Sequence, residues 1–229
     1  METYNSYLLS YLKYGDHDAI LHCFTEDHGY LSFFARGIYA AKNKKKPYLF
    51  PLNQLFITVS RRGSQDTMLR MSKIESTGSF YGDQNIAVST VLFFVADFLN
   101  QVLRDEGANG RLFLEIEAVR EAISSKKSDA YLAFIIRYLQ ISGVAPLSGS
   151  KPFLNPESGV FEDEISHTFF DEQISAIWQQ FLKADPIYNV TLKRRQRSAF
   201  LDSLMLYCQY HITGFHIPQS LAVVREIFD

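Results

Sequence analysis

A polar turn between two strand-like runs is the feature that most constrains how this chain folds. Apolar residues alternate on both sides of it, at Ala19, Leu21 and Cys23 before the turn and at Leu31, Phe33 and Ala35 after it. Alternation at period two places each set on one face of a strand. Gly29, which closes the turn, can take the positive φ that a tight hairpin needs. The stretch therefore predicts the centre of a small, strongly curved β-domain.

Five strand-like runs, separated by turn residues, fill the first third of the chain. They cover residues 7–13, 19–25, 30–36, 52–60 and 67–76. Five short antiparallel strands in so short a segment suit a small barrel. An OB-fold and an SH3-like barrel fit this pattern nearly equally well, so the residues alone leave both open.

After Ser76-Thr77-Gly78 the hydrophobic period changes from two to about 3.6, which predicts a domain boundary. Residues 1–80 are then a β-domain and residues 81–229 a helical domain, so the predicted fold class is two-domain α+β. Helices are predicted at 85–104, 109–124, 128–142, 171–183, 191–212 and 220–228. The first is apolar nearly all round, which predicts the buried central helix of the second domain. Prolines and glycines predict a hairpin insertion near 143–167.

A lysine-rich loop lies between the third and fourth predicted strands. Four of the five residues from Lys42 to Lys46 are lysines, and this charge cannot be buried, which predicts a solvated, mobile loop. A barrel can bring further cations, at a strand end and in a neighbouring turn, to the same rim. The candidate phosphate-binding residues are Arg36, Lys42, Lys44, Lys45, Lys46, Arg61 and Arg62. The alternative is that the loop only keeps the protein soluble.

Charge is distributed unevenly along the chain. The formal net charge is -2, but residues 1–80 hold ten Lys and Arg against seven Asp and Glu, whereas residues 81–229 hold thirteen against eighteen. This excludes a uniformly basic nucleic-acid binder and favours a local positive surface on the β-domain. Exposed aromatic rings, on which bases stack, would complete a single-strand site. The candidates are Tyr30, Phe34, Tyr39 and Tyr48, although each can equally be a core residue.

A second basic cluster begins the penultimate predicted helix. Lys193 and Arg197 share one face of that helix, and Arg194 lies on the next ridge, so the three make a positive edge. This edge is either a second phosphate track or a seat for an acidic peptide. The alternative is that its cations pair with acidic residues elsewhere in the domain.

Residues typical of metal sites and of catalysis are sparse. Asp16-His17-Asp18, with His22 and His28, is the cluster richest in metal-ligating types, but His17 points away from Asp18 and His22 in a strand. We therefore expect no metal. The chain also lacks the glycine-rich phosphate loops, the nucleophile elbow and the zinc-protease motif, so we expect no cofactor and no enzymatic activity.

Cysteines and hydropathy indicate the compartment. Cys23 and Cys208 lie in no Cys-x-x-Cys pair, which predicts two buried apolar residues rather than a zinc finger or a disulfide. No secretion signal and no membrane-spanning run is visible in the sequence. These observations predict a cytoplasmic protein.

The order of several short runs in the first third of the chain matches a known family pattern. The runs are Tyr7-Leu8-Leu9, Tyr14-Gly15-Asp16, Phe24-Thr25-Glu26-Asp27-His28-Gly29, Phe33-Phe34-Ala35-Arg36-Gly37 and Phe50-Pro51-Leu52-Asn53-Gln54-Leu55. This order resembles the RecO family of bacterial recombination mediators. The resemblance favours the OB-fold over the SH3-like barrel.

The resemblance to RecO also implies a function and partners. It implies a nucleoid-associated DNA repair mediator that binds single- and double-stranded DNA, anneals strands, and helps RecR to load RecA onto strands coated by single-stranded DNA-binding protein. In the family the helical domain captures the acidic C-terminal tail of that protein, for which Arg137 and Tyr138 are the candidates. Many members carry four zinc-binding cysteines where this chain has none, which implies a metal-free hairpin. The rival interpretation is a protein-interaction adaptor whose barrel does not bind DNA.

Overall fold

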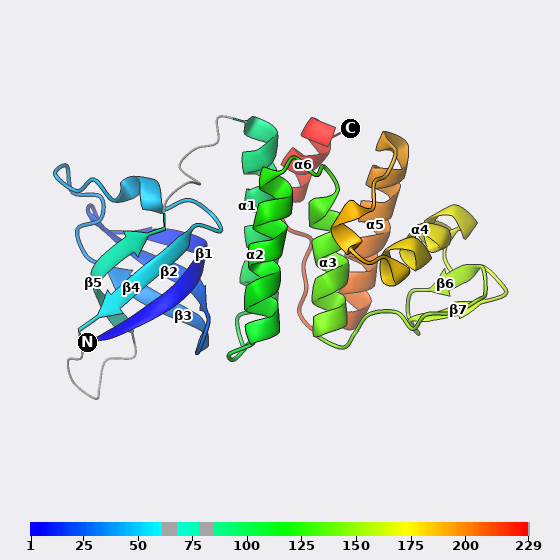
Figure 1. Cartoon of the computed structure of the whole chain (residues 1–229), viewed down its shortest axis with the longest axis horizontal. Helices are drawn as coiled ribbons and strands as arrows, with labels where there is room; N and C mark the ends of the chain where they lie inside the picture. The colour runs from blue at the N-terminus through cyan, green and yellow to red at the C-terminus, as the bar shows by residue number, and fades with distance from the viewer. Residues whose placement is uncertain (61–67, 78–84, 229) are drawn as a thin grey trace. The chain divides into compact units, whose positions relative to one another are not determined.

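The computed structural model describes residues 1–60, 68–77 and 85–228 (Figure 1). Its N-terminal part is a five-stranded closed barrel in the strand order β1-β2-β3-β5-β4. The elements are β1 (Glu2–Tyr14), β2 (Asp18–Thr25), β3 (Gly29–Ala35), the short 3-10 helix η1 (Lys46–Tyr48), β4 (Gln54–Val59) and β5 (Leu69–Ser76).

The strand pairing closes the barrel on itself. β1 pairs antiparallel with both β2 and β4, and β4 pairs antiparallel with β5. β5 then meets β3 in a short parallel pairing, in which Phe33 lies opposite Leu69 and Phe34 opposite Arg70. The OB-like barrel followed by helices confirms the predicted α+β fold class, and the SH3-like alternative is set aside.

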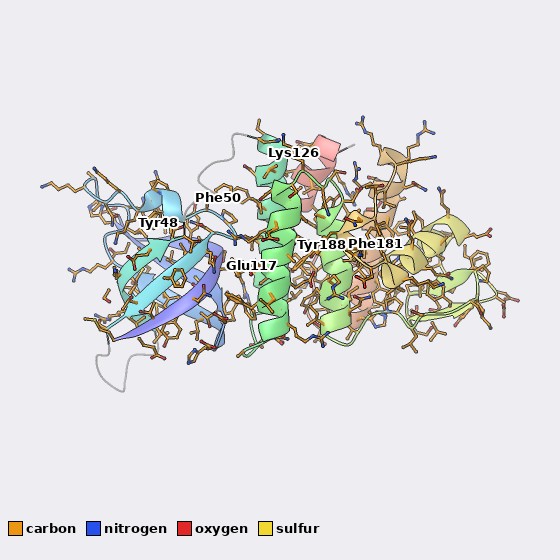
Figure 2. The ribbon with its side chains drawn as sticks, in the orientation of Figure 1. Tyr48, Phe50, Glu117, Lys126, Phe181 and Tyr188 are labelled. Carbon is orange, nitrogen blue, oxygen red and sulfur yellow. The ribbon has the colours of Figure 1, made fainter. Side chains whose placement is uncertain are left out.

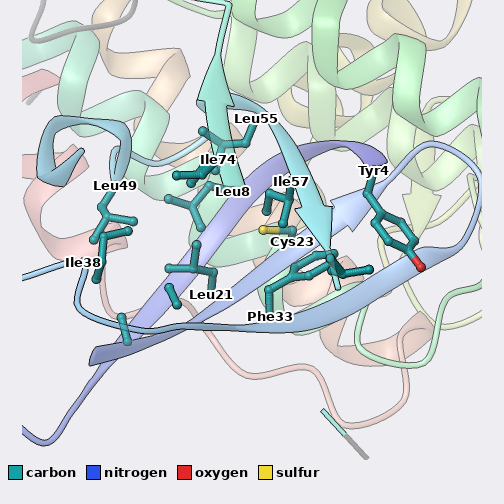
Figure 3. Packing of buried hydrophobic residues seen from close by; sticks show 13 residues of the cluster. Tyr4, Leu8, Leu21, Cys23, Phe33, Ile38, Leu49, Leu55, Ile57 and Ile74 are labelled. Carbon is teal, nitrogen blue, oxygen red and sulfur yellow. The ribbon is translucent and has the colours of Figure 1, made fainter. Parts of the chain in front are cut away.

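The core of the barrel is built from the predicted alternating face. Leu21, Cys23 and Phe33 have no exposed surface, and they pack with residues of β1, β4 and β5 (Figure 3). Each neighbour along the strand points to the other face, as the pleat of a strand requires. Burial raises the pKa of the Cys23 thiol to about 12, so this cysteine behaves as a small apolar core residue.

The turn between β2 and β3 makes a close contact with the segment after helix α1. Gly29 has φ +71°, and a Cβ placed there would lie 2.3 Å from the carbonyl oxygen of Glu106. The same oxygen accepts a hydrogen bond from the N–H of Tyr30 at 3.1 Å. Gly29 is therefore required both by its backbone conformation and by the approach of a second segment.

Replacing this glycine is expected to destabilise the barrel. Gly29→Ala adds a Cβ that collides with the Glu106 carbonyl, so we expect the free energy of unfolding to fall by about 3 kcal/mol or more. Gly15 is the matched control, because its φ is +58° and nothing lies within 4 Å of its added Cβ. Gly15→Ala should cost only about 1 kcal/mol. Urea denaturation measures both, and equal losses would contradict the role of the close contact.

Tertiary contacts divide the chain into two compact units, Met1–Leu114 and Glu115–Asp229. The first unit adds helix α1 (Ile86–Val102) to the barrel. Asn100, a polar residue in this largely apolar helix, accepts hydrogen bonds from the hydroxyls of Ser10 and Tyr30, each at 3.0 Å. The sequence predicted that this helix is the centre of the second domain. The hydrophobic pattern of the helix does not reveal that Asn100 accepts hydrogen bonds from barrel residues. The domain boundary at residue 80 stays a prediction.

The remaining elements are helices and one small hairpin. They are α2 (Gly110–Ser124), α3 (Ala130–Ile141), β6 (Phe153–Asn155), β7 (Val160–Glu162), η2 (Thr168–Phe170), α4 (Glu172–Lys183), η3 (Ile187–Asn189), α5 (Arg194–His211) and α6 (Leu221–Phe228). Each predicted helix is present, within three residues of its predicted ends. Within the described ranges, no helix has the length and apolar character needed to cross a bilayer.

The β6–β7 hairpin is stabilised by apolar packing and by side-chain hydrogen bonds. Leu154 and Phe161 are buried, and the N–H of Leu154 donates to the hydroxyl of Ser175 at 2.9 Å. The amide oxygen of Asn155 accepts from the backbone N–H of Glu157 at 3.0 Å, which shapes the turn. Nowhere in the described part of the chain do three or more His, Cys, Asp or Glu side chains gather as metal ligands would.

Candidate nucleic-acid interface

Four side chains, which we call the Tyr39 cluster, lie together at one end of the barrel: Tyr11, Lys13, Tyr39 and Lys46. The ammonium groups of Lys13 and Lys46 each lie 6.0 Å from the centre of the Tyr39 ring. Burial and the neighbouring Tyr11 raise the pKa of the Tyr39 hydroxyl. Neither lysine has a carboxylate partner among the described residues. The cluster thus combines two uncompensated cations with aromatic rings.

A bulge in β1 places Tyr11 and Lys13 in this cluster. The register of β1 against β2 shifts between Leu8 and Ser10, so that Leu8 lies opposite Cys23 but Tyr11 lies opposite Leu21. An extra residue in a strand exchanges the faces of all residues that follow it. Odd-numbered residues of β1 beyond the bulge therefore share the inner face of the barrel at its open end.

The segment after β3 is fixed to the β1–β2 turn, and this fixes Tyr39. The N–H of Gly37 donates to the carboxylate of Asp18 at 2.7 Å, and the N–H of Tyr39 donates to the carbonyl of His17 at 2.9 Å. Gly37 has φ +66°, a conformation that favours glycine. These bonds hold the Tyr39 ring beside the end of β1.

Asn43 organises the predicted lysine loop. Its side-chain amide donates to the carbonyl of Gly37 at 2.9 Å, and its oxygen accepts from the N–H of Lys45 at 2.9 Å. Lys42, Lys44 and Lys46 are exposed and Lys45 is half-buried, so the solvated character of the loop is confirmed. The mobility of the loop stays a prediction. The contact between Lys46 and Tyr39 connects the loop to the cluster.

The other cations predicted to bind phosphate in the first domain differ in where the structure places them. Arg36 is exposed at the end of β3, directly before Gly37. Arg61 and Arg62 lie outside the described residues. Lys13 was missed by sequence reasoning, because only the bulge in β1 brings it to the inner face. The signal available in the sequence was weak, since Lys13 is a single cation at the end of an apolar strand.

The four candidate stacking residues are all half-buried and differ in their contacts. Tyr30 stacks on His22 and donates to Asn100, and Tyr48 packs against the barrel core (Figure 2). Phe33 is fully buried, whereas Phe34 is half-buried, as the alternation of the strand predicts. The Phe34 ring makes an edge contact with exposed Tyr14, their centres 5.9 Å apart. Tyr39, like Tyr48, packs one side against the barrel core, and its half-buried ring lies near the two lysines of the Tyr39 cluster.

The second basic cluster separates into paired and unpaired cations. Arg197 forms an ion pair with Asp129, whose side chain is only 2% exposed. Asp129 also accepts a hydrogen bond from the N–H of Leu192 at 2.9 Å. The charge of Arg197 is therefore engaged within the second unit. Lys193 and Arg194 are exposed and make no side-chain hydrogen bond or ion pair with the described residues.

The unpaired cations line a pocket of about 570 Å³ in the second unit. Its walls come from the start of α4 and the start of α5. Lys193, Arg194 and Arg195 line one side, and Asp171 and Gln173 are among the residues from α4 and its N-terminal cap. The structure thus brings together Lys193 and Arg194, as predicted, and adds Arg195 to them.

Comparison with known proteins agrees with the barrel and the order of its motifs. The family model described as Recombination protein O N terminal matches residues 1–80. A DNA repair protein RecO from Christiangramia forsetii is 29% identical over 231 residues, and one from Flavobacterium psychrophilum is 26% identical over 230 residues. Each alignment covers 96% of this chain and 96% of the relative. The first 80 residues thus match the RecO N-terminal family model, and nearly the whole chain is similar to RecO proteins.

The residues matched by the family model include the whole Tyr39 cluster. The nearly full-length relatives extend the similarity into the helical part, where the resemblance to RecO suggested Arg137 and Tyr138 as partner-binding residues. Arg137 donates to the carboxylate of Glu115 at 3.2 Å and is 37% exposed. Tyr138 is only 6% exposed. A role for either residue in partner binding stays a prediction.

Glu115 accounts for the position of Arg137. Tyr188 donates its hydroxyl to the same carboxylate. Burial, followed by the charge of Glu115, raises the pKa of Tyr188, so the phenol keeps its proton. Gln140 accepts a further hydrogen bond from Arg137 at 3.0 Å. Glu115 thus binds α3 and the segment around η3 within the second unit.

Arg197 and Arg194 are expected to differ in their effect on stability. Arg197→Met leaves the buried carboxylate of Asp129 uncompensated, so we expect the free energy of unfolding to fall by about 3–5 kcal/mol. Arg194→Met removes an exposed, unpaired charge and should change it by no more than about 0.5 kcal/mol. Chemical denaturation of the two variants measures the difference. Similar small effects in both would contradict a structural role for Arg197.

Proposed function

We propose that this protein acts in DNA repair and recombination and binds DNA at the open end of its barrel. The observation that carries the proposal is the pair of lysine ammonium groups, each 6.0 Å from the centre of the Tyr39 ring, neither of which pairs with a carboxylate of the described residues. Single-strand binding proteins combine cations that follow the phosphates with aromatic rings on which bases stack. Five-stranded OB barrels are a common support for such sites. The names of the relatives, DNA repair protein RecO, support the same class.

In this proposal the cations bind the phosphates and Tyr39 stacks on a base. Lys13 and Lys46 contact phosphates on either side of the ring, and the lysine loop extends this positive surface through Lys42, Lys44 and Lys45. Arg36 adds a further contact, and Arg61 and Arg62 remain candidates. All these groups bind features that every nucleotide shares, so binding is independent of sequence.

Sequence-independent binding suits a recombination mediator. We propose that the protein binds both single- and double-stranded DNA, anneals complementary strands and, with RecR, assists the loading of RecA onto strands coated by single-stranded DNA-binding protein. Similarity to RecO proteins supports this role. The helical unit would bind the protein partners, including the tail of single-stranded DNA-binding protein. We propose no catalytic step, since the sequence holds no recognisable catalytic motif.

The alternative is an adaptor that binds proteins only, with a purely structural barrel. It predicts no binding of a labelled oligonucleotide even at low salt. The lysines of the Tyr39 cluster favour the DNA-binding proposal, because neither Lys13 nor Lys46 forms an ion pair with a carboxylate among the described residues.

The salt dependence of binding tests the role of Lys13 and Lys46. Affinity for a single strand should fall with salt at a slope of about -0.7 for each phosphate neutralised, and we expect roughly 4 to 6 phosphates. The double variant Lys13→Gln, Lys46→Gln should make the slope shallower by about 1.4, because two contacts are lost. Fluorescence anisotropy with a labelled oligonucleotide measures this slope.

Lys126→Gln with Lys183→Gln is the charge-matched control for that experiment. Both lysines are exposed and lie in the helical unit, away from the pocket lining. The control variant has the same net charge as the test variant, so it should retain the slope of the unaltered protein. Equal slopes in the two variants would exclude Lys13 and Lys46 from the interface.

Substitutions of Tyr39 separate base stacking from charge. Tyr39→Ala should weaken single-strand binding by about 1–3 kcal/mol, because it removes a stacking surface, whereas Tyr39→Phe keeps the ring and should bind nearly as well. The salt slope should be similar in all three proteins, since no cation is removed. Anisotropy titration at constant salt measures the affinities. Equal weakening in both variants would show that the hydroxyl, rather than the ring, is important.

A further inference from the structure

The pocket between the starts of α4 and α5 is separate in its residues from the Tyr39 cluster. Its volume of about 570 Å³ lies in the range of sites that hold small ligands. Lys193, Arg194 and Arg195 follow one another along its wall, and all three are exposed. In the described ranges, their side chains make no hydrogen bond and no ion pair.

The positive charge of this pocket is only partly compensated by the described residues that line it. Asp171 is the one acidic residue of the described lining, so the lining carries three positive charges and one negative, a balance of +2. The carboxylate of Asp171 already accepts a hydrogen bond from the N–H of Ile174 at 2.8 Å, as the N-cap of α4. Arg197, by contrast, has its own buried carboxylate. A concave surface with this charge suits an anion.

We propose that this pocket binds a terminal phosphate group, as carried by a nucleotide or by the end of a nucleic-acid strand. A phosphomonoester has close to two negative charges and three acceptor oxygens, which matches the excess charge of the lining. Arginine presents a planar fork of N–H donors that fits two phosphate oxygens at once. An internal phosphodiester carries only one charge and follows an open row of cations rather than a pocket.

The polar side chains beside the cations fit the same ligand. The amide oxygen of Gln196 accepts from the N–H of Lys193 at 3.1 Å, which leaves the amide N–H groups of Gln196 as donors. Gln173 supplies a second amide to the lining. A pocket whose side chains are mostly donors binds a group made of acceptors.

The lining favours a phosphate over an acidic peptide. Ile174 and Ala199 are the two apolar residues of the described lining, and none of the lining residues described is aromatic. Peptide segments obtain most of their affinity from apolar or aromatic anchors that enter hydrophobic pockets. The inference goes beyond DNA binding at the barrel and does not depend on it, because the two sets of residues are distinct.

Binding of paired short ligands by the full-length protein tests the proposal. The ligands are a labelled trinucleotide with a 5′-phosphate and the same trinucleotide with a 5′-hydroxyl. We expect the phosphorylated form to bind at least about tenfold more tightly, because charge-assisted hydrogen bonds form only with it. Arg194→Gln with Arg195→Gln should abolish this preference. The charge-matched control, Lys126→Gln with Lys183→Gln, should keep it.

Competition identifies the source of the phosphate. If inorganic phosphate displaces the 5′-phosphate trinucleotide at concentrations that leave the 5′-hydroxyl trinucleotide bound, the pocket binds a free phosphate group. If only phosphorylated strands displace it, the pocket binds the end of a strand. Equal binding of the two trinucleotides overturns the proposal. The proposal is also overturned if an acidic peptide displaces the trinucleotide and phosphate does not, because the pocket is then a peptide site.

A long oligonucleotide with a 5′-hydroxyl separates this proposal from DNA binding at the barrel. The pocket variant should bind that oligonucleotide with unchanged affinity, because its Tyr39 cluster is intact. Loss of long-strand binding in the Tyr39 cluster variants, with the 5′-phosphate preference retained, shows two independent sites. The failure of one proposal therefore leaves the other testable.

Discussion

The barrel depends on the burial of one alternating face of β2 and β3. Leu21, Cys23 and Phe33 fill its interior and have no exposed surface. Because the faces of a strand alternate, burial of this set fixes the orientation of every other residue in the two strands. The residues that hold Tyr39 in place, Asp18 and His17, lie at and directly before the start of β2, next to this buried face. The candidate DNA site is therefore a consequence of how the core packs.

Burial and pairing separate the structural cations of this chain from those available to a ligand. Arg197 and Arg137 neutralise carboxylates that are largely buried, and removing either cation would leave a costly unpaired charge. Lys13, Lys46 and Arg194 have no such partner among the described residues. A positive charge near other positive charges raises the free energy of the isolated protein slightly, so an anionic ligand that offsets this repulsion binds more favourably.

The two proposed sites bind different parts of a nucleic acid. The Tyr39 cluster combines charge with an aromatic ring, which suits the repeating phosphates and bases of a strand. The pocket of the second unit combines charge with amide donors and little apolar surface, which suits a compact group with several acceptor oxygens. In both proposals the residues bind groups that all nucleotides share.

The sequence by itself determined the elements and the fold class. Period-two alternation around Gly29 and the later helical period follow from backbone geometry, so the helices and the strands β2 to β5 lie close to their predicted positions. Strand β1 begins at Glu2, five residues before its predicted start. The similarity to RecO, read from short motifs in the first third of the chain, chose the OB-like barrel over an SH3-like one, and the comparisons confirmed the family.

Only the tertiary structure decided which cations are available. The bulge in β1 turns Lys13 toward Tyr39, and a strand pattern does not reveal where such an extra residue is accommodated. Arg197 and Asp129 are 68 residues apart in sequence, yet they form a pair, whereas Arg194, three residues before Arg197, has no such partner among the described residues. Pairing of charges depends on distances between segments remote in sequence, and local pattern contains no record of those distances.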